Sequence, residues 1–176
     1  KVDYASAFGY SNEASGLASS AVGFRNKAAS ENASAVGYGN NANALAASAV
    51  GYNNTAGGVG SSTIGYNNTA TNENASAFGY GNTAGGLASS AFGFSNTASG
   101  DNANAFGYNN IASGSKSNVF GTGNTVSGSS STAVGTANEV AAENSTAIGN
   151  NNTISAGAEN SAALGNNISI SLKDSV

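Results

Sequence analysis

A motif of a small residue, a larger apolar residue and glycine recurs along the whole chain, and its period is the strongest constraint on the fold. Each step between motif glycines is 14 residues except the last, which is 16 and therefore contains a two-residue insertion. The twelve motif glycines are Gly9, Gly23, Gly37, Gly51, Gly65, Gly79, Gly93, Gly107, Gly121, Gly135, Gly149 and Gly165. Such regularity predicts a repeat architecture in which neighbouring units stack to make one continuous core.

Three further positions of the repeat hold a restricted set of residue types. Ala occupies the second position before the glycine in ten of twelve copies, with Thr63 and Val119 as the exceptions. Asn occupies the third position after the glycine in eleven copies, beginning with Asn12. Ala occupies the fifth position after the glycine in the first eight copies, and the column then changes to Val126, Val140 and Ile154.

The Ala columns lie seven residues apart, as in Ala21, Ala28 and Ala35, but a coiled coil is excluded. A heptad repeat requires two large apolar positions, and Ala with Gly is too small to fill them. Each Gly in a helix interior would also cost about 1 kcal/mol relative to Ala. The β-branched, aromatic and turn-forming residues instead favour one short strand and one turn for each seven residues.

Two short strands per repeat predict an all-β fold, a flattened parallel β-solenoid. Within 20–24, alternation places Ala21 and Gly23 on one face and Ser20, Val22 and Phe24 on the other. A second short strand surrounds Ala28. We expect Asn and Gly to supply the positive φ angles of the turns, and successive Asn residues to form a hydrogen-bonded ladder. The interior of such a narrow coil is expected to accept only Ala, Gly and Ser.

Two columns of large side chains must then face outward from the coils. The residue before each motif glycine forms the first column: Phe8, Val22, Val36, Val50, Ile64, Phe78, Phe92, Phe106, Phe120, Val134, Ile148 and Leu164. The residue after it is aromatic in the first eight copies: Tyr10, Phe24, Tyr38, Tyr52, Tyr66, Tyr80, Phe94 and Tyr108. The second column then changes to Thr122, Thr136, Asn150 and Asn166.

This apolar stripe predicts association between chains. Coils stacked at about 4.8 Å would expose a stripe on the order of 600 Å², the upper end for a monomer surface. Burying each large side chain stabilises an assembly by about 1.5–3 kcal/mol. The sequence therefore predicts a homo-oligomer, and the stripe alone leaves the number of chains open.

The consensus Ser-x-Ala-[Val/Ile]-Gly-x-x-Asn-x-Ala-x-Gly resembles the repeats of YadA-like heads in trimeric autotransporter adhesins, over essentially the whole chain. The resemblance implies a left-handed parallel β-roll of three identical chains, displayed at a Gram-negative cell surface. It implies anchoring to the outer membrane through regions outside this sequence. It also implies that the column from Phe8 to Leu164 builds the trimer core. The regular aromatic column after the glycine departs from the family pattern.

The repeat also predicts the domain organisation. Residues 1–166 are expected to form a head of twelve repeats, and residues 167–176 a strand-like continuation into a further repeat. Ile168 to Leu172 alternate as a strand does, and the next motif glycine would fall just beyond Val176. Both ends fall inside a repeat, so we expect the sequence to be a piece of a longer protein.

Composition argues against catalysis and several kinds of ligand. The chain has no His to activate a serine and no His or Cys to bind zinc. Acidic residues such as Glu31, Glu73 and Asp101 are isolated and form no calcium loop. A net charge of -4 disfavours nucleic acid, and no apolar run is long enough to span a membrane. No catalytic residue, metal site or cofactor is predicted, and the 14-residue period argues against a hexapeptide acyltransferase.

Four surface features have competing interpretations. Packing between coils or chains is favoured for the aromatic column over receptor or ligand contact. Turn formation is favoured for the Asn column over binding of ions or sugars. The column Thr55, Thr69, Thr83 and Thr97 suggests an ice-binding surface, although only Thr69 and Thr71 form a pair. Sequons such as those at Asn53 and Asn67 are expected by chance in a chain so rich in Asn, Ser and Thr.

The leading hypothesis for function is an adhesin head that binds host extracellular matrix or cell-surface proteins, because many weak contacts on several chains add avidity. The alternative is a passive spacer that displays a distal binding domain. Ice binding is the less favoured third hypothesis.

Overall fold

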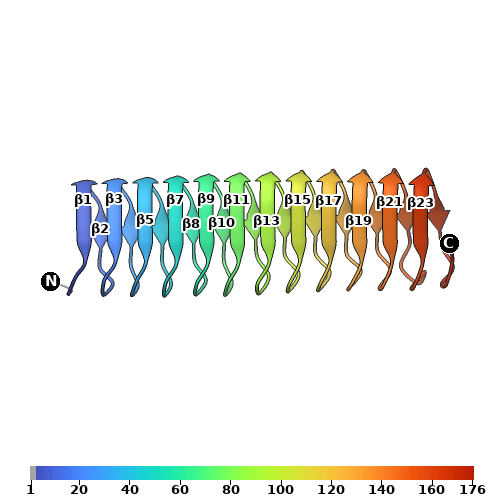
Figure 1. The fold of residues 1–176 in the computed structure, drawn as a ribbon, viewed down its shortest axis with the longest axis horizontal. Coiled ribbons are helices and arrows are strands. Elements are labelled where there is room, and N and C mark those ends of the chain that lie inside the picture. The colour runs from blue at the N-terminus through green and yellow to red at the C-terminus, as the bar shows by residue number, and fades with distance from the viewer. Residues whose placement is uncertain (1–2) are drawn as a thin grey trace. The chain divides into compact units, whose positions relative to one another are not determined.

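The computed structural model describes residues 3–176, in which all regular structure is β. The chain divides into two units, the first ending at Ala88 and the second beginning at Ser89. Each unit contains six coils, and each coil has one five-residue strand and one two-residue strand joined by turns (Figure 1). The predicted parallel β-solenoid of 14-residue coils is confirmed for both units.

In the first unit, strands alternate between long and short along the chain. The long strands are β1 (Ser6–Tyr10), β3 (Ser20–Phe24), β5 (Ser34–Tyr38), β7 (Ser48–Tyr52), β9 (Ser62–Tyr66) and β11 (Ser76–Tyr80). The short strands are β2 (Glu13–Ala14), β4 (Lys27–Ala28), β6 (Asn41–Ala42), β8 (Thr55–Ala56), β10 (Thr69–Ala70) and β12 (Thr83–Ala84). Long strands pair only with long strands, and short with short, so each coil contributes one strand to each of two sheets.

The second unit repeats this arrangement. Its long strands are β13 (Ser90–Phe94), β15 (Asn104–Tyr108), β17 (Asn118–Thr122), β19 (Thr132–Thr136), β21 (Thr146–Asn150) and β23 (Ala162–Asn166). Its short strands are β14 (Thr97–Ala98), β16 (Ile111–Ala112), β18 (Thr125–Val126), β20 (Glu139–Val140), β22 (Thr153–Ile154) and β24 (Ser169–Ile170). The alternating segment after residue 167 therefore contains a strand of only two residues.

The pairing register turns the columns of the sequence into columns in space. In the first unit, β7 pairs with β9 in parallel, so that Val50 lies beside Ile64 and Tyr52 beside Tyr66. The offset between paired residues is one repeat throughout each unit, and it is fixed because a slip would bring unlike residues together. Each position of the repeat therefore stacks on the same position of the next coil.

Alanine fills the narrow space between the two sheets. Ala21 of β3 and Ala28 of β4 are completely buried, as are Ala35 and Ala42 of the next coil. Ala33, in the turn before β5, is buried with them. The columns predicted to face inward therefore do so from the second coil onward, and the core of these first-unit coils consists mainly of methyl groups.

The Asn ladder is confirmed, but it lies inside the coils rather than in the turns. Asn54 is completely buried, and its side-chain amide donates to the main-chain oxygens of Val50 and Gly65 at 3.0 and 2.8 Å. Its side-chain oxygen accepts from the main-chain N–H of Asn68 at 2.9 Å. An amide can occupy the dry interior because its donors and acceptor are all satisfied there.

The expectation that only Ala, Gly and Ser fit inside is therefore wrong. Besides Asn, the second unit buries Val119, Val126, Val140 and Ile154 completely. Apolar side chains of this size gain free energy on leaving water, and the coils that contain them have a larger apolar core than the Ala-filled coils.

Both turns of each coil contain a residue with positive φ, one position before an interior residue. The first lies two residues after the motif glycine and is Asn53, at φ 55°, in the fourth coil. The second lies nine residues after the motif glycine. In the third coil this residue is Ala46, which has φ 55° although it has a Cβ. Turn Asn residues are thus present as predicted, but they precede the ladder Asn in the sequence.

The motif glycine is required by the stacking itself. Gly51 has φ 118°, a conformation that side chains disfavour, and a Cβ placed on it would lie 2.1 Å from the main-chain oxygen of Gly65. The successive coils approach too closely at this point for any other residue.

The two-residue insertion leaves the stack intact. Ala156 and Gly157 lie in an exposed turn between β22 and β23. On either side the pairing continues with an offset of 16 residues, Ile148 beside Leu164 and Ile154 beside Ile170. The extra residues therefore loop outward without changing any column.

No helix within residues 3–176 is long and apolar enough to cross a membrane.

Candidate functional site

The outer face of the long strands carries both predicted columns of large side chains. We call the residues from Phe8 to Leu164 before the motif glycines the apolar column, and those from Tyr10 to Tyr108 after them the aromatic column. On the isolated chain, Ile64 is 46% exposed and Tyr66 is 43% exposed. Both columns lie outside the Ala core, on the outer face of the long strands.

The rings of the aromatic column stack face to face between coils. In the first unit, the centroids of Tyr38 and Tyr52 are 4.8 Å apart with an interplanar angle of 4°, and Tyr52 stacks on Tyr66 at 4.9 Å and 3°. Since each face is covered by the next ring, only ring edges and hydroxyl groups reach the surface. The column can offer hydrogen bonds and edge contacts, but within the stack it offers no open ring face for a sugar.

The apolar column contains a similar stack in the second unit. Phe92 and Phe106 lie 4.9 Å apart, and Phe106 stacks on Phe120 at 5.3 Å. Beside them, Phe94 stacks on Tyr108 at 5.3 Å. Two ring stacks therefore run side by side here on the same sheet.

The outer face of the long strands carries no charge. None of the long strands of either unit contains an ionisable group other than tyrosine. Copies of this face could therefore approach one another without repulsion between like charges.

One exposed apolar set was missed by the sequence analysis. Leu17, Leu45, Val59 and Leu87 lie in first-unit turns that follow the short strands, and each is 43–46% exposed. Their common position, eight residues after the motif glycine, was a signal in the sequence. Charged Glu31 and Glu73 interrupt the column, so this edge is only partly apolar.

Apart from Ile111, the short-strand sheets present a largely polar outer face. Thr55, Thr69 and Thr83 form a column in the first unit, and Thr97 occupies the same position in the second. Two residues further on, the neighbouring column holds Gly57, Thr71, Gly85 and Ser99. The paired Thr columns that would favour ice binding are therefore not formed on this face.

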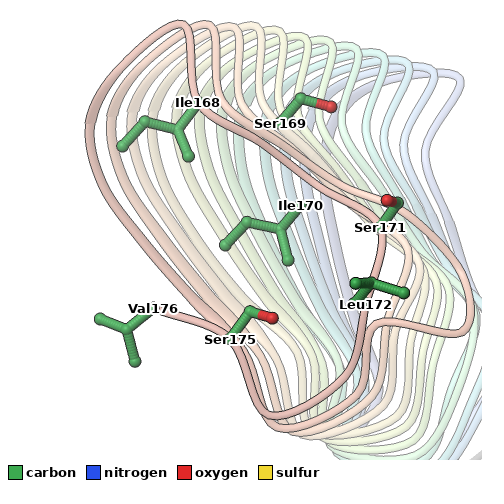
Figure 2. A pocket seen from close by; sticks show the side chains of 7 residues that line it. All are labelled: Ile168, Ser169, Ile170, Ser171, Leu172, Ser175 and Val176. Atoms are coloured by element: carbon green, nitrogen blue, oxygen red, sulfur yellow. The ribbon is translucent and has the colours of Figure 1, made fainter.

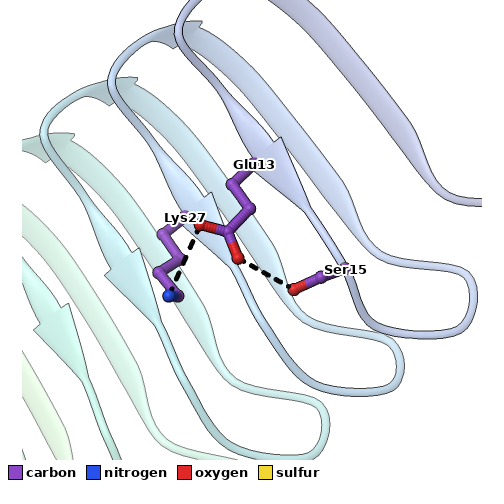
Figure 3. Close-up of polar contacts among 3 residues, drawn as sticks. All are labelled: Glu13, Ser15 and Lys27. Atoms are coloured by element: carbon purple, nitrogen blue, oxygen red, sulfur yellow. Dashed lines mark hydrogen bonds and ion pairs between the residues drawn. The ribbon is translucent and has the colours of Figure 1, made fainter.

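Charged groups are sparse and exposed. Lys27 and Glu13 form an ion pair of 3.4 Å across neighbouring coils, and the hydroxyl of Ser15 donates to the same carboxylate at 3.3 Å (Figure 3). Both charged side chains are about half exposed, so the pair contributes at most about 1 kcal/mol. The guanidinium of Arg25 lies over the Phe24 ring, 5.0 Å from its centroid.

A pocket at the last coil has no ionisable lining. Figure 2 shows the seven side chains that surround it: Ile168, Ser169, Ile170, Ser171, Leu172, Ser175 and Val176. Serines without a neighbouring base are not activated as nucleophiles, so the pocket offers no acid–base or nucleophilic chemistry. Across residues 3–176, no three His, Cys, Asp or Glu side chains are grouped so as to hold a metal ion.

The sequons at Asn53 and Asn67 lie on exposed turns. The Asn53 side-chain amide donates to the Asn67 side-chain oxygen at 3.2 Å. The neighbouring residues, Asn54 and Asn68, are buried ladder residues. The sequon pattern thus follows from the repeat, in which a turn Asn precedes the ladder Asn and a strand Thr.

Comparison with protein families gives one match. The family model for the YadA head domain repeat, which spans two repeat copies, matches residues 3–26, 28–54, 56–82, 84–110 and 127–152. These segments cover well over half of the chain, and the longest stretches outside them are residues 111–126 and those after 152. No curated protein sequence matches the chain.

Proposed function

Because the chain belongs to the YadA head domain family, we propose that it is the head region of a trimeric adhesin that attaches a bacterium to host extracellular matrix or to host cell-surface proteins. The family is one of adhesin-type head domains. The proposal adds the three-chain assembly, the host target and the display at the outer membrane surface.

The exposed apolar column is the observation that carries the proposal. Val36 and Ile148 are 38% and 44% exposed on a single chain, although both lie in an ordered column on an uncharged sheet. Full burial of such a side chain from water is worth about 1.5–3 kcal/mol, so covering the two fifths still exposed would add roughly 0.6–1.3 kcal/mol per residue, repeated along the column. In the proposed assembly, three copies meet along this column, from Phe8 to Leu164, and it forms the shared core.

Adhesion would use the surfaces that remain outside the trimer core. The short-strand face carries Thr at the same position of four successive repeats, Thr55, Thr69, Thr83 and Thr97, and a trimer would present this column three times. A target that contacts many coils weakly would be held by avidity, which exceeds the affinity of any one contact. No enzymatic step is required of such a protein.

The solution mass tests the assembly. Light scattering on a sizing column should give a mass of three chains for the recombinant protein. A folded monomer would overturn the proposed trimer core.

Direct binding tests the function. The assembled protein should bind at least one immobilised host matrix or cell-surface glycoprotein, and cultured host cells. A variant with Thr69→Arg and Thr83→Arg tests whether the short-strand face is the binding surface. It should bind more weakly, while its mass stays that of three chains. If neither a broad glycoprotein panel nor cells are bound, the adhesin proposal is wrong.

The regularity of the coils favours a second candidate, a spacer that holds a distal binding domain away from the cell. The apolar column keeps a large apolar residue in every repeat, and the insertion at Ala156 and Gly157 does not interrupt it, since Ile148 pairs with Leu164. Deleting two whole repeats from the full-length protein on cells separates the two candidates. Adhesion that persists unchanged supports the spacer, and adhesion that falls supports a binding head.

A further inference from the structure

The surface and the interior of the coils change together between the eighth and ninth repeats. In the first eight coils the residue after the motif glycine is aromatic, and the interior residue four positions later is Ala. In the last four coils the outer residue is Thr or Asn and the inner residue is Val or Ile. These pairs are Thr122 with Val126, Thr136 with Val140, Asn150 with Ile154, and Asn166 with Ile170.

The burial of these side chains shows the effect of the change in residue types. In the eighth coil, Tyr108 is 53% exposed, whereas Ala112 is completely buried. In the ninth coil, Thr122 is a small polar surface residue, and both Val119 and Val126 are completely buried. Apolar bulk has therefore moved from the outside of the coil to the inside. Coils of the first type, with an aromatic residue outside and Ala inside, depend on their outer face for apolar burial. Coils of the second type, with Thr or Asn outside and Val or Ile inside, contain their own core.

A second ladder joins the last coils. The main-chain N–H of Ser145 donates to the hydroxyl oxygen of Ser131 at 3.0 Å, that of Ser161 to Ser145 at 3.1 Å, and that of Ser175 to Ser161 at 3.0 Å. In the third coil, Ala47 occupies the same column, and its N–H bonds within its own turn to Ala44. The last coils thus have an additional bond between coils that the Ala-containing coils lack.

The aromatic coils expose enough apolar surface to need a partner. An aromatic side chain buries about 150–250 Å² when fully enclosed, so rings that are 41–46% exposed leave roughly 60–110 Å² each in water. Added over the first unit and combined with the apolar column, this approaches the roughly 800 Å² per partner of a stable interface. The uncharged long-strand face, with the same spacing in every copy, fits a second copy of this chain best.

We infer that the last four coils hold their fold within a single chain, whereas the first eight hold theirs only when further copies cover the aromatic and apolar columns. This inference rests on the proposed homotrimer. It makes assembly directional: the region after Asn118 forms first in each chain, and the aromatic coils become ordered as the chains join. Folding of coils 1–8 is thereby coupled to association.

Hydrogen–deuterium exchange on a non-assembling variant tests the inference. Val36→Lys with Ile64→Lys places charges on the apolar column at exposed positions, and should give a monomer by light scattering. In that monomer, amides of residues 6–112 should exchange at least about tenfold faster than in the wild-type assembly, and those of residues 118–170 should stay within about threefold. Equal loss in both regions, or retention in both, would overturn the inference.

The mass separates failure of the trimer from failure of the inference. If the Lys variant still has the mass of three chains, the proposed core is wrong, and the exchange pattern is then compared with that of wild type diluted until it dissociates. A wild type that is itself monomeric and fully protected would overturn both proposals. The control Thr69→Lys with Thr83→Lys, on the short-strand face, should keep both the mass and the protection.

Swapping the residue types of two coils tests directly whether the position of the apolar side chains sets the protection. In the Lys background, Tyr108→Thr with Ala112→Val gives the eighth coil the second type, and should slow exchange of residues 104–112 by at least about tenfold. Thr122→Tyr with Val126→Ala gives the ninth coil the first type, and should speed amide exchange of residues 118–126. If the boundary between protected and unprotected amides moves in neither variant, the position of the apolar side chains does not set the stability of the coils.

Discussion

The side-chain amide of Asn54 donates a hydrogen bond of 2.8 Å to the main-chain oxygen of Gly65 in the next coil. The same oxygen lies 2.1 Å from the position that a Cβ on Gly51 would occupy. The ladder Asn and the motif glycine therefore act together. The glycine has no side chain, so the coils can approach, and the Asn amide then forms a hydrogen bond between them. This explains why the two residues keep a spacing of three along the chain.

Replacing Asn54 by Ala should destabilise the fold strongly. The change leaves the main-chain oxygens of Val50 and Gly65 without the amide donor, and the main-chain N–H of Asn68 without its acceptor. Each unsatisfied buried group costs about 1–3 kcal/mol, so we expect a loss of about 3 kcal/mol or more in the free energy of unfolding. Denaturant unfolding measures it. Asn43→Ala, at an exposed position, is the control and should change the value by less than about 0.5 kcal/mol.

Replacing Gly51 by Ala should be at least as damaging. The variant combines a disfavoured φ of 118° with a collision against main-chain atoms that cannot move without parting the coils. We expect a loss exceeding about 3 kcal/mol, or failure to fold. Gly39→Ala is the matched control, because its φ is 64° and the nearest atom to its Cβ is 3.6 Å away. A cost near 1 kcal/mol is expected there, and equal costs at both sites would contradict the steric account.

The repeat made much of this fold predictable. Because each residue stacks on its equivalent one repeat away, the period predicts the parallel register, the inward Ala columns and the outward position of residues such as Ile64 and Tyr66. The ladder of Asn was also predictable from its column. What the sequence did not reveal was the depth of that column, since Asn is usually a turn residue and only the bonding of Asn54 makes its burial favourable.

The candidate surface was only partly predictable. Alternation places Val22 and Phe24 outside the Ala core, but it does not tell whether the rings lie flat or stack; the structure shows stacking. The interior Val residues were visible as a column, yet their burial depends on a coil that is wide enough, which alternation cannot give. The roles of the two outer columns in assembly and adhesion stay predictions, because they concern other molecules.

Ile154 and Ile148, in the same coil, should respond differently to truncation. Ile154→Ala empties a completely buried site and should cost about 2–5 kcal/mol at every protein concentration. Ile148 is 44% exposed on the single chain, so Ile148→Ala should cost little in a monomer and more in the assembly that covers it. Thermal unfolding over a hundredfold range of protein concentration measures both. An Ile148→Ala effect that is small and independent of concentration in an assembled protein would place this residue outside the core of the assembly.

Removing the insertion should leave the fold almost unchanged. Deletion of Ala156 and Gly157 joins Ser155 directly to Ala158, as Ala141 is joined to Ala142 in the preceding coil. Ala156 and Gly157 are exposed, and a Cβ on Gly157 would touch nothing within 4 Å, so no packing is lost. We expect a change within about 1 kcal/mol, because shortening a loop by two residues changes its closure entropy little. Deleting Ile148 and Gly149 instead removes the same number of residues but takes the motif from β21, and should cost more than about 4 kcal/mol. Circular dichroism melts of the two deletions compare them directly. Similar losses in both would mean that the insertion, despite its exposure, is needed to join the last coil to the stack.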